Sequence, residues 1–459
     1  MTPRSVAAIA ALGVLAGCAG PAAERPPAAA VTVPPVWRET TAPGAAVELA
    51  WWRSYGDAAL SALVEQAVHR NSDVAVAAAR VAEARAQLGV ARARLLPSLD
   101  LNVSAGRARR LNSFGTPGEA NSFSTQFQAA YEVDLFGRSG DLVGAAGAAV
   151  HAGEAARDAL ALSVAATAAQ SYIALRALDA RLAVARETLR SRADALRLAQ
   201  SRFRQGYGTR LEVEQAQAEY DATAEVVPQT ELAVARQENA IGQLVGDPSG
   251  AVARGAGIAA LALPAVSAGL PAEVLRRRPD IAQAEYQLAA SDARLVAARK
   301  AFLPRIDLAA SLGKLAMSGL PANPNLLWSV GGSVLAPIFD GGRLEGEMGV
   351  ATAQRDQAAF AYRKTVLNAF REVNDNLTAL RTLDVQRAHV AARRDALSQA
   401  LHHAVRRYQA GYSPYLEQLD AQRNLFNAEL SLIQVRADQL NASVALYLAL
   451  GGGWQPERR

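Results

Sequence analysis

Apolar and polar side chains alternate strictly through residues 121–136, NSFSTQFQAAYEVDLF. The odd positions are mostly apolar and the even positions mostly polar, which predicts a β-strand with one apolar and one polar face. Three other stretches alternate in the same way. The pattern predicts four strands, at about 98–105, 122–135, 305–313 and 326–338.

Helical periodicity surrounds these strands. Apolar residues recur in alternating steps of three and four through two proline-free stretches, which predict long helices at 138–205 and 343–410. At 1.5 Å per residue, each helix would be roughly 100 Å long. Shorter helices are expected at 279–302, 210–246 and 415–450.

Arginines, among them Arg192 and Arg387, occupy the apolar seam of the long helices. A charged residue in a seam is costly unless it is paired or reaches solvent. The pattern therefore suggests that this face packs in an assembly wider than a simple dimer.

The chain contains one unit twice. Residues 71–101 align with 278–308, and SRFRQGYGTRLEVEQAQAE at 201–219 aligns with RRYQAGYSPYLEQLDAQRN at 406–424. The duplication has the order helix, two strands, long helix, return helix in each half. The domains expected are a first repeat at 57–262, a second at 263–450 and a short tail at 451–459.

The N-terminus, MTPRSVAAIAALGVLAGCAG, has the basic Arg4, an apolar stretch and small residues up to Cys18. It reads as a signal peptide at 1–17, too short to span a bilayer permanently, followed by a linker at 18–56. LAGC resembles the bacterial lipobox, in which the cysteine becomes N-terminal and acylated. Cys18 is the only cysteine, which excludes an intrachain disulfide and favours a covalent lipid. An ordinary secretory signal that happens to contain cysteine is the alternative.

Composition narrows the class of protein. Hydrophobic residues make up 51% of the chain but aromatic residues only 6%, because alanine is abundant. The net charge of +5 comes from arginines interspersed with acidic residues, as on solvated helix faces. No basic block carries interleaved aromatics, so nucleic acid is not an expected partner.

The predicted strands have two possible settings, a soluble sandwich or a membrane barrel. Each strand is long enough for a tilted membrane crossing of about 9 to 11 residues, and the flanking helices are too long for a globular domain. Only closed barrels satisfy the backbone in lipid, and four strands cannot close. The chain must therefore oligomerise, and three copies would supply twelve strands.

The segments YEVDLFGR, PIFDGGRL, AYRKTVLNAFREVNDNL and YLEQLDAQRN closely resemble the TolC-like OprM/NodT group of outer-membrane efflux lipoproteins. The resemblance covers nearly all of the mature chain. It implies an α+β membrane fold: a homotrimer with a twelve-stranded outer-membrane β-barrel, continuous with a long periplasmic α-helical coiled-coil barrel. It also implies an equatorial belt, which would include part of 18–56.

The same resemblance implies a function. The chain would be the exit duct of a tripartite efflux pump, docked to a periplasmic adaptor and powered by an inner-membrane RND-type transporter. It would lie in the outer membrane of a Gram-negative bacterium, spanning it and anchored by lipid, and Ala19 after the cysteine favours that membrane. A periplasmic adaptor or a coiled-coil scaffold lipoprotein is the alternative, although neither accounts for both the strands and the duplication.

The resemblance places the pore constriction just after the second Gly-Tyr tip, at Leu416 and Asp420. These residues are four apart and so share a helix face, and a three-fold axis would make them a collar and a carboxylate ring. The first repeat has Leu211 and Gln215 at the aligned positions, so it lacks the acid. The sequence therefore assigns the gate to the second tip. The alternatives are a solvated helix carboxylate at Asp420 and ordinary coiled-coil packing at Leu416.

Five further residues of the duplicated tips are expected to shape the tips rather than the pore. They are Gly206, Tyr207, Arg407, Gly411 and Tyr412. Arg407 and Tyr412 could latch a closed form by hydrogen bonds to a neighbouring helix. Because both have partners in the first repeat, a purely structural role is equally compatible.

No catalytic or metal-binding constellation is evident in the sequence. His402 and His403 are adjacent on a helix and point in different directions, which disfavours a shared metal. FDGGR lacks the spacing of a phosphate loop and reads as a strand-to-helix joint. We expect no enzyme activity and no cofactor beyond the lipid on Cys18, and the cargo is not specified.

Overall fold

A computed structural model describes residues 26–39, 47–111, 115–248, 251–318 and 324–455. The chain forms two compact units, each assembled from distant segments. Unit 1 consists of Met1–Val31, Ala79–Glu154 and Gln283–Lys364. Unit 2 consists of Thr32–Ala78, Ala155–Ala282 and Thr365–Arg459.

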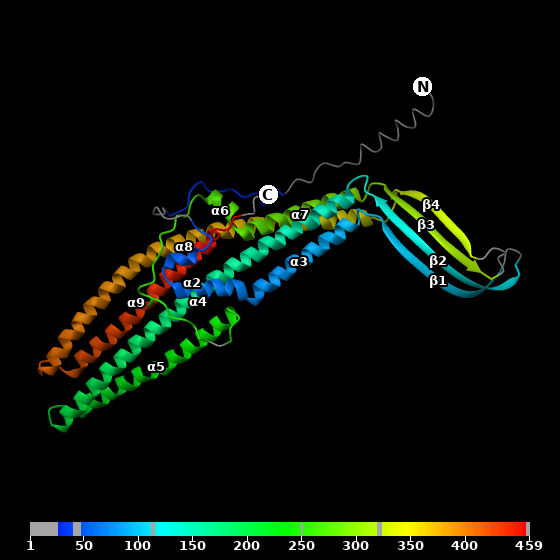
Figure 1. Cartoon of the computed structure of the whole chain (residues 1–459). Coiled ribbons are helices and arrows are strands. Elements are labelled where there is room, and N and C mark those ends of the chain that lie inside the picture. Colours follow the sequence, from blue (N-terminus) through cyan, green and yellow to red (C-terminus); the bar gives the residue numbers. More distant parts are fainter. Residues whose placement is uncertain (1–25, 40–46, 112–114, 249–250, 319–323, 456–459) are drawn as a thin grey trace. The chain divides into compact units, whose positions relative to one another are not determined.

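The element order repeats (Figure 1). The first repeat contains α3 (Ser72–Ala93), β1 (Ser98–Leu111), β2 (Pro117–Val133), α4 (Arg138–Arg204) and α5 (Arg210–Leu244). The second contains α7 (Pro279–Lys300), β3 (Arg305–Met317), β4 (Asn325–Leu335), α8 (Arg343–Gln409) and α9 (Tyr415–Ala449). Short elements stand outside this pattern: η1 (Pro27–Ala29), η2 (Trp51–Tyr55), α2 (Ala58–Arg70) and α6 (Pro271–Arg277).

The four strands form one antiparallel sheet in unit 1, in the order β1-β2-β3-β4. The expected end of β1 near 105 is wrong, because the strand continues pairing with β2 to Leu111. Backbone pairing does not require one face of the strand to be apolar. The strand therefore continues past the residue at which the alternation of apolar and polar side chains stops. The expected end of β4 near 338 is also wrong: the strand ends at Leu335, before Pro337, which has no N–H to donate.

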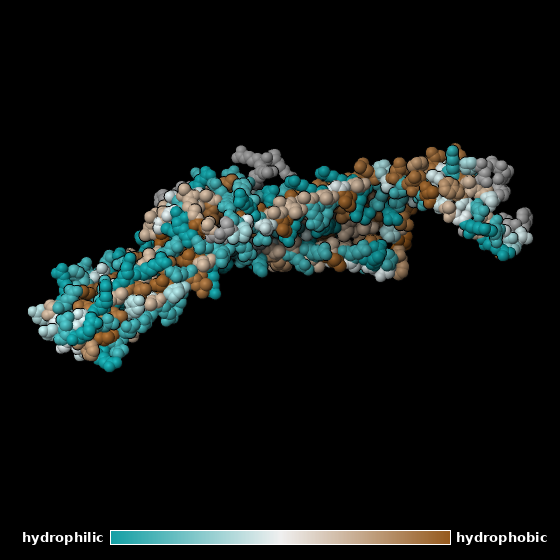
Figure 2. Space-filling model, turned by 60° about the horizontal axis from the view of Figure 1, so that its bottom comes forward, coloured by the Kyte–Doolittle hydropathy of each residue, from teal (hydrophilic) through white to brown (hydrophobic). Residues whose placement is uncertain are grey.

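The sheet has two unlike faces. Pairing is continuous across all three ladders, so alternate residues of each strand share a face. The apolar face carries Leu99, Leu101, Val103, Phe123, Phe127, Leu308, Leu312, Leu326, Trp328, Val330 and Val334, all exposed in the single chain. The polar face carries the serine pairs Ser104–Ser124 and Ser311–Ser329, with 2.8 Å between the Oγ atoms in each pair. Figure 2 shows the hydrophobic surface over part of the sheet.

The long helices of the two repeats begin with similar caps. Asp134 accepts hydrogen bonds from the backbone N–H groups of Ser139 and Gly140, at 3.0 and 2.7 Å. Asp340 does the same for Gly342 and Leu344, at 3.2 and 3.1 Å. A carboxylate satisfies the unpaired N–H groups of a helix start and suits its dipole. These caps confirm FDGGR as a strand-to-helix joint.

Unit 2 has an aromatic core. The Trp51 ring stacks on Tyr447 with 5.0 Å between centroids, and the Tyr55 hydroxyl donates to Ser443 Oγ at 3.0 Å. The buried Asp57 caps α2 through the N–H of Leu60 at 2.9 Å. It also accepts from the backbone N–H of Ala256 at 2.7 Å and from the Tyr172 hydroxyl. One carboxylate thus holds three segments of unit 2 together.

Candidate functional site: the helix tips of unit 2

Both Gly-Tyr corners have the same backbone geometry. Gly206 and Gly411 each have φ of 80°, a left-handed conformation that only glycine adopts without strain. The N–H of Tyr207 donates to the Arg202 carbonyl and that of Tyr412 to the Arg407 carbonyl, both at 2.9 Å. This is the Schellman end of a helix.

The two return helices start differently. Thr209 and Glu212 form a reciprocal capping box at the start of α5. At the aligned place before α9 stands Pro414, whose side chain makes no capping hydrogen bond. Local capping hydrogen bonds therefore stabilise the first tip, whereas the second tip depends more on tertiary packing.

That packing comes from two buried tyrosines. The rings of Tyr408 and Tyr415 lie 5.4 Å apart, and Arg202 stacks over Tyr408 at 4.7 Å. Arg202 also donates from Nη1 to the Tyr408 carbonyl at 3.1 Å. The buried cluster they belong to, the tip cluster, comprises Ala195, Leu196, Ala199, Ala216, Tyr408, Tyr415 and Leu419. It joins the α4–α5 hairpin to the α8–α9 hairpin, which lie side by side (Figure 1).

A charged network crosses the same interface. Glu219 on α5 is 7% exposed and accepts a hydrogen bond from Arg192 on α4, which is 3% exposed. Its other oxygen, Oε1, accepts from Nε of Arg423 on α9 at 2.6 Å. One carboxylate thus binds guanidinium groups from both hairpins. Arg192 can occupy the apolar seam because Glu219 of the same chain pairs with it. A wider assembly is therefore not needed to explain this arginine.

Burial and pairing act differently on the two guanidinium groups. Burial lowers the pKa of Arg192, although Glu219 opposes this effect. The hydrogen bonds that Arg423 donates to Glu219 raise the pKa of Arg423, which is partly exposed. Since arginine titrates far above neutral pH, both remain charged and the network is ionic.

Leu416 and Asp420 lie on an exposed side of α9, each one residue after a buried member of the tip cluster, Tyr415 or Leu419. Leu416 is 56% exposed, and Asp420 is also exposed. The Asp420 carboxylate accepts a hydrogen bond from Asn424 Nδ2 at 3.1 Å, one turn further along. Both side chains therefore keep surface that a neighbouring copy or a pore could contact.

Tyr207 and Tyr412 protrude from the tips, 77% and 81% exposed. Arg407 pairs with Glu417 in its own tip, with 3.5 Å between Nη1 and Oε1. Arg202, its repeat partner, instead contacts Tyr408. The aligned arginines thus have different contacts, which the duplication alone did not predict.

The sequence reasoning missed Glu219, Arg423 and Tyr415. A difference between the repeats could have indicated Glu219, because the second repeat has Asn424 at the aligned position. Which cations Glu219 meets depends on how two hairpins pack, which alignment of the repeats does not reveal. Cys18 lies outside the described residues.

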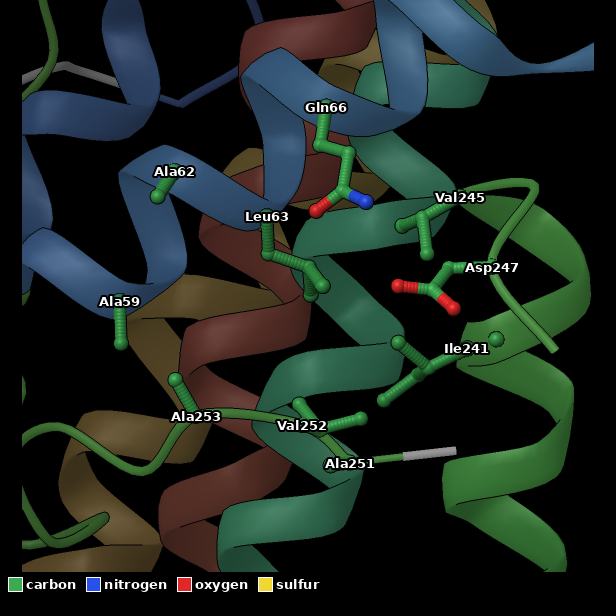
Figure 3. A pocket seen from close by; sticks show the side chains of 11 residues that line it. Ala59, Ala62, Leu63, Gln66, Ile241, Val245, Asp247, Ala251, Val252 and Ala253 are labelled. Carbon is green, nitrogen blue, oxygen red and sulfur yellow. The ribbon is translucent and has the colours of Figure 1, made fainter. Parts of the chain in front are cut away.

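Unit 2 also contains a cavity of about 150 Å³ between α2, the end of α5 and residues 251–253 (Figure 3). Eleven residues line it, and only Gln66 and Asp247 have polar side chains. The lining offers no nucleophile paired with a base. We therefore interpret the cavity as a gap in helix packing and not as a reaction site.

Comparison with known proteins identifies the class. The family model described as Outer membrane efflux protein matches residues 63–247 and 270–452. The chain belongs to this family.

Two relatives come from Pseudomonas aeruginosa. The pyoverdine export outer membrane protein OpmQ is 34% identical over 418 residues, which cover 89% of this chain and 88% of that protein. Outer membrane protein OprJ is 35% identical over 432 residues, covering 90% and 88%. Both names describe outer-membrane proteins, and that of OpmQ describes export.

Solved structures of outer-membrane channels have the same fold as this chain. The outer-membrane channel OprN superposes with a TM-score of 0.86 at 29% identity, covering 96% of this chain and all of that one. The open state of the Neisseria gonorrhoeae MtrE outer membrane channel gives 0.84 at 28% identity, covering 95% and 98%. The predicted α+β membrane fold is confirmed. The chain is an outer-membrane efflux channel with a large periplasmic portion, and the adaptor alternative is wrong.

Proposed function

We propose that three copies of the chain form a passive exit duct, gated at the second helix tip by Leu416 and Asp420. The exposure of these two side chains on α9 carries the proposal. Four strands leave two sheet edges unpaired, and three copies would close twelve strands into a barrel. On a three-fold axis, Asp420 becomes a ring of carboxylates beside a collar of Leu416.

The ring would favour cations. Two unit charges about 6 Å apart interact by roughly 2 to 3 kcal/mol at an effective dielectric near 20. That energy is enough to attract cations but not to close a pore. Closure therefore requires the tips to lean inward, and opening requires an adaptor to move the α8–α9 hairpin away from the axis.

The partners of the duct are a periplasmic adaptor and an inner-membrane RND-type transporter, since relatives of this chain are efflux channels. Cys18 carries the lipid that anchors the N-terminus. Transport here is passive, with no chemistry at the duct, no metal and no cofactor. OpmQ is named for pyoverdine export, but nothing in the described residues selects a cargo.

Single-channel recordings of Asp420→Ala and Leu416→Ala in planar bilayers test the gate. We expect reduced cation selectivity in the first variant and larger conductance in the second. Unchanged conductance and selectivity in both variants would refute the gate. Recovery of each variant as a trimer shows that the channel itself has assembled.

A further inference from the structure

The loop end of the apolar face of the sheet carries positive charge. By the β1–β2 register, Arg107 and Arg109 share a face with Leu99. By the β3 registers, Lys314 lies on the same face, paired with Thr125 on one side and Leu326 on the other. All three cationic side chains are exposed. They are named here the loop-end cations.

Two of these cations occupy equivalent positions in the repeats. The alignment that pairs Asp100 with Asp307 also pairs Arg107 with Lys314. Arg107 stands eight residues beyond Leu99, and Lys314 eight beyond Ile306, which shares the apolar face. Eight residues at about 3.4 Å, tilted by about 40°, rise roughly 20 Å. Both cations therefore lie near the outer edge of an apolar band about 25 Å tall.

The positive charge is only partly balanced. Among the described residues, Arg107 pairs with Glu119 at 2.6 Å, in an exposed pair with side-chain exposures of 73% and 52%. Arg109 lies opposite Glu119 in the register, and neither Arg109 nor Lys314 forms an ion pair there. The described part of this end of the apolar face thus carries three cations and one carboxylate, and Lys314 lies six residues along β2 from that carboxylate. An exposed pair contributes little to stability and can rearrange around an added anion.

The neighbouring surface is apolar. Val103 and Phe123 share this face and are 57% and 50% exposed. Val103 precedes Arg107 on β1, and the register places it level with Lys314 through Thr125. A molecule bound across this border needs anionic groups at one end and hydrocarbon at the other. Phosphorylated lipids have this chemistry, and guanidinium and ammonium groups both bind phosphate.

We propose that Arg107, Arg109 and Lys314 form a binding site on the outer rim of the barrel for the phosphate groups of outer-leaflet lipids. The occupant is a phosphorylated glycolipid whose acyl chains lie along Val103 and Phe123. In three chains the duplicated pair Arg107 and Lys314 gives six cations around the rim. The proposal rests on the three-chain barrel and is independent of the gate.

The test titrates the purified full-length trimer in neutral detergent with bisphosphorylated lipid A, with binding followed by native mass spectrometry. The same lipid without phosphates is the second probe. We expect roughly 100-fold tighter binding of the phosphorylated form, about fivefold for each cation. The triple variant R107Q/R109Q/K314Q should lose this preference, and Lys314→Gln alone should lose about fivefold.

The matched control is Arg305→Gln, at the helix end of β3 on the opposite face, where Arg305 pairs with Asp307 at 3.1 Å. It should keep the wild-type preference. Equal binding of the two lipids to wild type, or an unchanged preference in the triple variant, overturns the site. Displacement by inorganic phosphate at matched phosphate concentration overturns the lipid assignment. The trimer mass is recorded in each titration, so that failure of the barrel is distinguished from failure of the site.

Discussion

Arg423 on α9 donates from Nε to Oε1 of Glu219 on α5 at 2.6 Å, which links α9 to the α4–α5 hairpin. Three residues before Arg423, Asp420 faces outward on the same helix. Glu219 is buried and also bound by Arg192, whereas Arg423 is about half exposed. The exposed end of this network is therefore the part that can release without unfolding the tip.

The first prediction concerns release of this link. Arg423→Gln leaves Glu219 paired with Arg192, so the free energy of unfolding should change by about 1 kcal/mol or less. We propose that this contact is made in the closed form of the gate, so losing about 1 kcal/mol of it should raise the open-to-closed ratio roughly fivefold. Open probability in planar bilayers measures this ratio. Arg406→Gln, which removes an exposed charge from the end of α8, is the control, and equal open probability in both variants contradicts the link.

A second prediction concerns Tyr415, whose ring is buried in the tip cluster and whose hydroxyl has no hydrogen-bond partner among the described residues. Tyr415→Ala should lower the free energy of unfolding by about 3 to 5 kcal/mol, because a large cavity forms. Tyr415→Phe should be neutral or stabilising, since it removes only an unpaired buried hydroxyl. Thermal or denaturant unfolding followed by circular dichroism measures both. The exposed Tyr412→Ala should stay within about 0.5 kcal/mol of wild type, and a similar loss for the Tyr412 and Tyr415 alanine variants would argue against the cluster.

A third prediction follows from Glu429 on α9. Burial raises the pKa of its carboxyl, although Arg394 lowers it. The folded state therefore binds this proton more tightly than the unfolded state. Its contribution to stability is fully present below the unfolded pKa near 4.3, and is lost as pH rises through the folded pKa.

Glutamine does not titrate, so Glu429→Gln should unfold at a higher temperature than wild type at pH 7 to 8. The difference should shrink toward pH 4, and melting curves across this range measure it. The exposed Glu225→Gln serves as the control. A difference between Glu429→Gln and wild type that is constant with pH would contradict the burial effect.

The sequence by itself determined the order of elements and the class of protein. Alternation around Phe123 and Phe127 specifies a strand because side chains of a strand point to opposite faces, and this holds whatever the neighbours are. Gly206 and Gly411 specify helix ends because a left-handed residue is a local requirement. The duplication shows the same strand and helix-end patterns in both halves of the chain.

The tertiary structure alone decided which side chains meet. Nothing local marks Glu219 as the partner of both Arg192 and Arg423, because these residues come from three helices that approach only when the hairpins pack. Strand register likewise placed Arg107 and Lys314 on the apolar face, beyond the points near 105 in β1 and 313 in β3 where the alternation had been expected to end. Local patterns follow from the geometry of one segment, whereas these juxtapositions depend on long-range packing and pairing.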